Sequence, residues 1–77
     1  MHITLNGDPT ELPEPLSVQA LLDRLGIDGR MVAVEHNLVV VRRANYATTM
    51  IEDGAEVEIV NFVGGGSGDR QLLDSGF

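Results

Sequence analysis

The sequence contains no cysteine, and this absence excludes several kinds of site at once. Disulfide bonds, thiolate metal sites and cysteine nucleophiles are all ruled out. The chain also has no side chain on which sulfur could be held as a persulfide. A lack of cysteine is compatible with a reducing compartment, and we expect a cytoplasmic protein.

Basic residues are also scarce. The chain has five Lys and Arg residues against twelve Asp and Glu, a formal net charge of −7. Phosphate binding requires clustered cations, and Arg42-Arg43 is the only adjacent pair. Nucleic acid is therefore not an expected partner. An acidic surface suits a partner protein with a basic docking site.

Long apolar runs are missing as well. No stretch approaches the roughly 18 apolar residues of a membrane span, and residues 1–4 lack the basic charge of a signal peptide. The 77 residues allow one domain, and a chain this short buries only about 60% of its unfolded surface. Little room remains for an internal active-site cleft. This favours a carrier, an adaptor or a subunit over a free-standing enzyme, and we expect a protein that is monomeric when free.

The patterns predict the element order β-β-α-β-β-(short helix)-β. Residues 1–6 alternate apolar with polar, Asn6-Gly7 favours a hairpin turn, and residues 10–12 form a short return strand that Pro13 ends. Further strands are expected at 31–35, 38–41 and 55–63, with one helical turn near Ala44. Met50 and Ile51 are expected to be apolar plugs beneath that loop.

The most clearly marked element is the helix after Ser17, whose hydroxyl can cap a helix N-terminus. Gly26 fits the left-handed position that ends a helix, and Ile27 can fold back on Leu22. The apolar stripe falls at i, i+3, i+4 and i+7, on Val18, Leu21, Leu22 and Leu25. These features predict an α+β fold, a mixed sheet with one packed helix, its first and last strands adjacent at the centre.

The last strand changes its pattern along its length. Val57 and Ile59 alternate with Glu56 and Glu58, and Val60 and Phe62 then continue the acidic face. If the helix covers the other face, Val60 and Phe62 are exposed beside the glycines and form a docking patch. The alternative is that both pack beneath the loop around Tyr46.

Three glycines, Gly64, Gly65 and Gly66, follow this strand. Glycine has no Cβ, so such a run can pass through a narrow site where any side chain would clash. The alternative is a plain linker, because 64–68 reads GGGSG. The run lacks the Lys-Ser/Thr of a phosphate-binding loop. His2 and His36 lack ligand spacing, and no metal site is expected.

A set of residues in these elements resembles the ThiS family, the small sulfur carriers of thiamine biosynthesis. The residues are Val32-Ala33-Val34-Glu35, Asn37, Tyr46, Asp53-Gly54, Val57-Glu58-Ile59-Val60 and Phe62-Val63-Gly64-Gly65-Gly66. The resemblance covers Met1 to Gly66. It implies a ubiquitin-like β-grasp domain over residues 1–66.

The resemblance also implies a mechanism. In the family, a ThiF-like partner uses ATP and Mg²⁺ to adenylate the carboxylate of the last glycine, which becomes a thiocarboxylate. A ThiG-like thiazole synthase then receives the sulfur. Gly66 is the implied attachment point, and no cofactor is expected to bind the carrier itself. The residues expected to bind the partner are Val60, Phe62, Val63, Gly64 and Gly65.

The chain departs from the family in two places. Family members end at the glycines, whereas this sequence continues from Ser67 to Phe77, so Gly66 carries an amide. We expect residues 67–77 to be disordered. Either they are removed, or they begin a fused partner or an altered reading frame, or this copy does not carry sulfur. Many relatives have Gly in place of Leu38, and the turn is expected to be reshaped.

Two other functions remain open from the sequence. One is the related sulfur carrier of molybdopterin synthase, with the same chemistry and a different acceptor. The other is a β-grasp interaction module whose glycines are only a linker.

Overall fold

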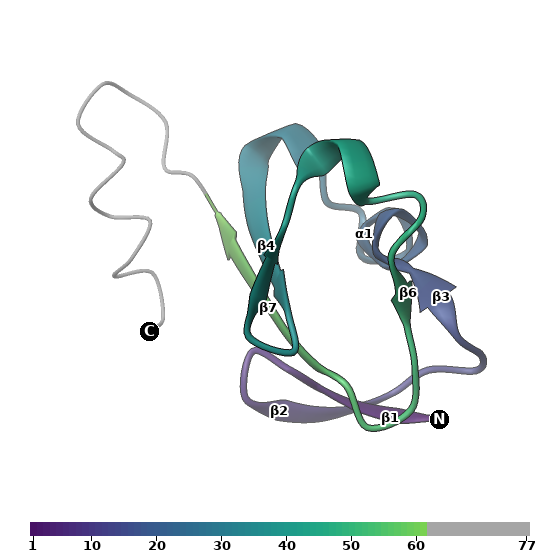
Figure 1. Ribbon diagram of the computed structural model, residues 1–77. Helices are drawn as coiled ribbons and strands as arrows, with labels where there is room; N and C mark the ends of the chain where they lie inside the picture. The colour runs from purple at the N-terminus through teal and green to yellow at the C-terminus, as the bar shows by residue number, and fades with distance from the viewer. Residues whose placement is uncertain (62–77) are drawn as a thin grey trace.

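The computed structural model describes residues 1–61, which form a five-stranded mixed sheet with one helix against one face (Figure 1). The strand order is β2-β1-β7-β4-β5. The bounds are β1 His2–Leu5, β2 Asp8–Glu11, β4 Val32–His36, β5 Val39–Val41 and β7 Glu56–Asn61. This is the predicted α+β arrangement with a ubiquitin-like β-grasp fold.

Strand β7 lies at the centre of the sheet. It pairs in parallel with β1 and antiparallel with β4, and the hairpins β1–β2 and β4–β5 form the two outer pairs. The prediction that the first and last strands lie side by side is confirmed. The chain segment that leads to the glycines is therefore held from both sides.

Helix α1 spans Val18–Leu25 and has the predicted caps at both ends. The Ser17 hydroxyl accepts a hydrogen bond from the Ala20 N–H at 3.0 Å, and Gly26 is left-handed with φ 72°. The Ile27 N–H donates to the Leu22 carbonyl at 2.9 Å, which closes the predicted turn back onto the helix.

The core lies between α1 and the covered face of the sheet. Its buried members are Ile3, Leu12, Val18, Leu21, Leu22, Val32, Val34, Tyr46, Ile51, Ala55, Val57 and Ile59. The Tyr46 hydroxyl donates to the Val32 carbonyl at 3.3 Å, and burial raises the pKa of that phenol. Tyr46 thus fastens the loop after β5 to the start of β4.

Several predicted details differ in the structure. Residues Met50–Ile51 are a short strand, β6, that pairs with β3 (Leu16–Ser17) beside the helix. The prediction that Met50 plugs the core is wrong, since its side chain is 45% exposed while Ile51 is fully buried. The return strand begins at Asp8, earlier than predicted. Two 3-10 turns complete the elements, η1 (Gly29–Met31) and the predicted one near Ala44, η2 (Arg43–Asn45).

The β4–β5 turn is not reshaped to suit a leucine. Asn37 and Leu38 both have positive φ, 52° and 71°, in a two-residue turn between paired His36 and Val39. This backbone matches the type I′ hairpin turn, which glycine adopts freely. Leucine at such a position costs roughly 1–2 kcal/mol.

Replacing Leu38 by glycine is therefore expected to stabilise the protein. Leu38 is 79% exposed, so almost no burial is lost. Relief of the φ strain outweighs the greater chain entropy of glycine, for a net gain of about 0.5–1 kcal/mol. Denaturant unfolding of Leu38→Gly measures this gain. Leu38→Ala is the control, because it removes the exposed side chain but keeps the Cβ that causes the strain; an equal gain in both variants would contradict this explanation.

Candidate functional site

The candidate site is the second half of β7, from Glu58 to Asn61, which precedes the predicted residues Phe62 to Gly66 in the sequence. Strand β1 pairs with β7 only at its beginning, through Thr4 with Glu56 and Leu5 with Val57. Beyond that point β1 turns away into its hairpin. On this side, the backbone N–H and C=O groups of β7 beyond Val57 need a different hydrogen-bond partner.

The Asn6 side chain is that group. Its Oδ1 accepts a hydrogen bond from the Ile59 N–H at 2.7 Å, and its Nδ2 donates to the Ile59 carbonyl at 3.3 Å. Asn6 has φ 50°, so the turn conformation aims its amide along the path that the next β1 residue would have taken. One amide side chain thus replaces one residue of the missing strand.

A second asparagine holds the start of β7 from the opposite side. The Asn37 Oδ1 accepts from the Glu56 N–H at 2.9 Å, while the Asn37 N–H donates to the Glu56 carbonyl at 2.7 Å. Asn6 was predicted only as a turn residue, and Asn37 was named only among the residues of the family resemblance. The sequence signal that they share is an Asn at each hairpin turn, but nothing in it indicated that both would bond to the last strand.

The face of β7 opposite the helix carries the predicted docking residue. Val57 and Ile59 are buried in the core, so Glu56, Glu58 and Val60 point to the open face of the sheet. Val60 is partly exposed beside its register partner Ala33 on β4. Because Tyr46 lies in the core on the other face, the alternative that Val60 packs beneath it is wrong.

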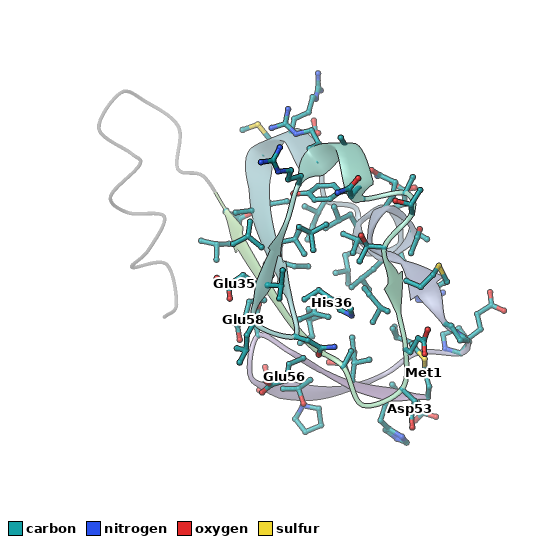
Figure 2. The ribbon with its side chains drawn as sticks, viewed as in Figure 1. Met1, Glu35, His36, Asp53, Glu56 and Glu58 are labelled. Atoms are coloured by element: carbon teal, nitrogen blue, oxygen red, sulfur yellow. The ribbon has the colours of Figure 1, made fainter. Side chains whose placement is uncertain are left out.

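Next to this apolar pair lies an acidic row. Glu58 and Glu35 are register partners on β7 and β4, and Glu56 lies on the same face (Figure 2). Like charges placed directly opposite each other on adjacent strands are destabilising. The salt bridges among residues 1–61, His2–Glu11 and Arg30–Asp28, leave these carboxylates unpaired within that range. The open face therefore combines a small apolar area with concentrated negative charge.

The other predicted site residues, Phe62, Val63, Gly64, Gly65 and Gly66, lie outside the described residues, as does the predicted extension 67–77. Within residues 1–61, no group of three His, Asp or Glu side chains is arranged to hold a metal ion. In the same range no helix is long and apolar enough to cross a membrane.

Comparison with known proteins identifies the family. The model of the ThiS family matches residues 3–66, so the match ends at the last of the three glycines. The chain belongs to the ThiS family. The ThiS thiamine biosynthesis protein of Geobacter metallireducens, a crystal structure, has a TM-score of 0.76 and 38% identity to it, covering 86% of this chain and 100% of that one.

Relatives of this ThiS-family chain include proteins of two sizes. A thiazole synthase of Paramagnetospirillum magneticum is 45% identical over 67 residues, which are 87% of this chain but only 21% of the relative. An uncharacterised protein of Porphyra purpurea, ycf40, is 39% identical over 66 residues, 86% of this chain and 93% of the relative. The chain thus spans about a fifth of the thiazole synthase and nearly all of the small relative.

Proposed function

We propose that this protein is a sulfur carrier for thiazole formation in thiamine biosynthesis, and that Gly66 is the residue that carries the sulfur. The observation that carries the proposal is the extent of the family match, which runs through the β-grasp domain and stops at Gly66. The thiazole synthase relatives favour the thiazole pathway over the molybdopterin pathway.

The chemistry requires a free carboxylate at Gly66. A partner enzyme directs a carboxylate oxygen of Gly66 to the α-phosphorus of ATP, with Mg²⁺ balancing the phosphate charge, and pyrophosphate leaves. A sulfur nucleophile then attacks the acyl adenylate carbonyl and AMP leaves. Adenylation is needed because an unactivated carboxylate has a poor leaving group. Without cysteine, the chain offers the terminal carboxylate as the attachment point for sulfur.

The carrier's own contribution is to present that carboxylate. Strand β7 is held by the Asn6 and Asn37 side chains and ends at Asn61. The position and direction of the strand that precedes the glycines are therefore set by the fold. The glycines that follow in the sequence fit a narrow partner site, and the open face of the sheet, with Val60 and the acidic row, docks on a basic and apolar surface of the partner.

The sequence continues past Gly66 to Ser67, and this sets a condition on the proposal. The Gly66 carbonyl is part of an amide there and cannot be adenylated. The active form must therefore end at Gly66, produced by cleavage of the Gly66–Ser67 bond.

The proposal is tested by activation in solution. A chain ending at Gly66 is mixed with a ThiF-like adenylating enzyme and ATP-Mg²⁺, and pyrophosphate release is measured. Release is expected with this chain and not with the chain ending at Phe77. Equal release from both chains, or none from either, would contradict the assignment of Gly66.

Val60→Asp is expected to lower the rate of this activation at least about tenfold, because a carboxylate replaces an apolar contact at the centre of the docking face. Thr48→Asp is the matched control, since Thr48 is exposed on a loop away from that face. It adds the same charge and should leave the rate unchanged. Circular dichroism of both variants checks that the fold is retained.

A further inference from the structure

The two edges of the sheet are built differently. Strand β2, Asp8–Glu11 of sequence DPTE, contains a proline and two acids, features that prevent another strand from pairing with an edge. Strand β5, Val39–Val41, consists of three valines. One edge is thus protected against strand addition, whereas the other has none of these protections within its length.

The valine edge is apolar and open. Val39 and Val40 are each 65% exposed, and Leu38 before them is more so. Leu38 also holds the positive φ described above. Neither burial of the side chain nor the backbone conformation favours leucine at position 38, so the stability of the fold does not explain this residue. Strain of this kind is frequently retained at binding surfaces.

The backbone of β5 also has unused hydrogen-bonding capacity. His36 and Val39 close a two-residue turn, so Val39 and Val41 direct their N–H and C=O groups towards β4. In an antiparallel pair these directions alternate, so the N–H and C=O of Val40 point away from the sheet. A further strand can bond to them.

A hollow of about 300 Å³ lies along the same edge, between β5 and the loop that carries Asn45 and Thr49. Val39, Val41 and Arg42 line it together with His36 from β4. A strand laid along β5 would point every second side chain towards this hollow. The hollow has room for an apolar side chain of moderate size.

Charge at the end of β5 indicates which strand fits. Arg42 and Arg43 are exposed, and neither forms a salt bridge within residues 1–61. They form a local positive area on a chain of net charge −7. A second copy of this acidic chain is therefore a poor occupant, and a segment with carboxylates at one end is a good one.

We propose that the β5 edge binds an extended segment of a partner protein, which adds as a sixth strand, places an apolar side chain in the hollow and sets carboxylates against Arg42 and Arg43. Strand β4 separates this edge from β7. The β5 edge is therefore distinct from strand β7, and the proposal does not depend on sulfur transfer.

The test uses blocked hexapeptides as probes in a titration of the ¹⁵N-labelled full chain followed by amide NMR spectra. EEVTVT presents its acids to the arginines when antiparallel, TVTVEE does so when parallel, and KKVTVT is the charge control. We expect one acidic peptide to shift the amides of residues 38–43 and Thr49. Its affinity should exceed that of KKVTVT at least about fivefold.

Two variants separate the contributions. Val40→Pro removes the outward N–H, and Arg42→Glu with Arg43→Glu reverses the charge; each should weaken the acidic peptide about tenfold or more. Thr10→Val, on the protected edge, is the control and should leave binding unchanged. The amide spectrum of each variant shows whether it is folded.

Four results of this titration would overturn the proposal, and a fifth concerns the free protein. These are no shift at millimolar peptide, shifts centred on β2, equal binding of the lysine peptide, and β5 amides that move with protein concentration alone. The last would identify a second copy as the occupant. Contacts between β5 and residues 62–77 in the free protein would likewise assign the edge to the chain's own segment.

Discussion

Growth without thiamine is expected to be lost when the chain ends at Val63 and to be retained when it ends at Gly66. The host is a bacterium whose own ThiS gene has been deleted, and each form is supplied on a plasmid. The two chains differ only in Gly64, Gly65 and Gly66, beyond the last described strand. Their folds should be equally stable, so the difference reports the chemistry of the chain end.

Chains of two further lengths test the position of the last residue more precisely. A chain ending at Gly65 has a free carboxylate and should still fail, because it falls one residue short of the reacting atoms. Misplacement of a reacting group by even about 1 Å can cost about a hundredfold in rate. A chain ending at Ser67 should fail unless the host removes the serine. Growth supported by the Val63 chain would favour the alternative that the glycines are only a linker.

The second large effect is expected from Asn6→Ala. The change leaves the backbone N–H and C=O of Ile59, a residue that is 7% exposed, without hydrogen-bond partners. It also places alanine at position 6, where φ is 50°, without a side-chain hydrogen bond to compensate for the backbone strain. Each lost partner of a buried backbone group costs about 1–3 kcal/mol, reduced here because the Asn6 bonds are only part-buried. We expect a loss of about 2–3 kcal/mol, measured by denaturant unfolding.

Two further variants divide this loss between its causes. Asn6→Asp keeps the acceptor for the Ile59 N–H but loses the donor to its carbonyl, so it should recover part of the stability. Asn6→Gly relieves the backbone strain but makes neither bond, so it should remain clearly destabilised. If Asn6→Gly were as stable as the natural chain, the side-chain bonds to β7 would contribute nothing and the account of how β7 is held would be wrong.

Much of the fold could be predicted because its signals are local. The helix is marked by Ser17 at one end and Gly26 at the other, with an apolar stripe between them that periodicity alone reveals. The central position of the last strand was also predicted. The helix features depend on residues close together in the chain, where spacing specifies geometry directly. The adjacency of the first and last strands is a long-range feature, and it was expected from the packing of a mixed sheet and not from spacing.

The features that were missed depend on contacts between distant residues. The β3–β6 pair joins Leu16 to Ile51 through strands of two residues each, too short to produce alternation. The Asn6 bonds cross 53 positions to Ile59. An asparagine in a turn has the same local signature whether its side chain faces solvent or a neighbouring strand. Such roles become visible only when the sheet order is known.

The candidate site also combines features that could be predicted from the sequence with features that could not. Val60 was correctly placed on the open face, because alternation from Val57 and Ile59 determines its side. The like-charged pair of Glu35 and Glu58 could not be predicted, because it requires the register between β4 and β7. The assignment of Gly66 rests on the family match and on chemistry, and it stays a prediction.

The mass of the protein isolated from its native host under thiamine limitation shows whether Gly66 carries sulfur. We predict a chain that ends at Gly66, with a fraction heavier by the exchange of one oxygen for one sulfur. That fraction should lose the excess mass after treatment with an alkylating reagent and hydrolysis. A population that consists only of chains extending past Gly66, with no sulfur at that residue, would contradict it.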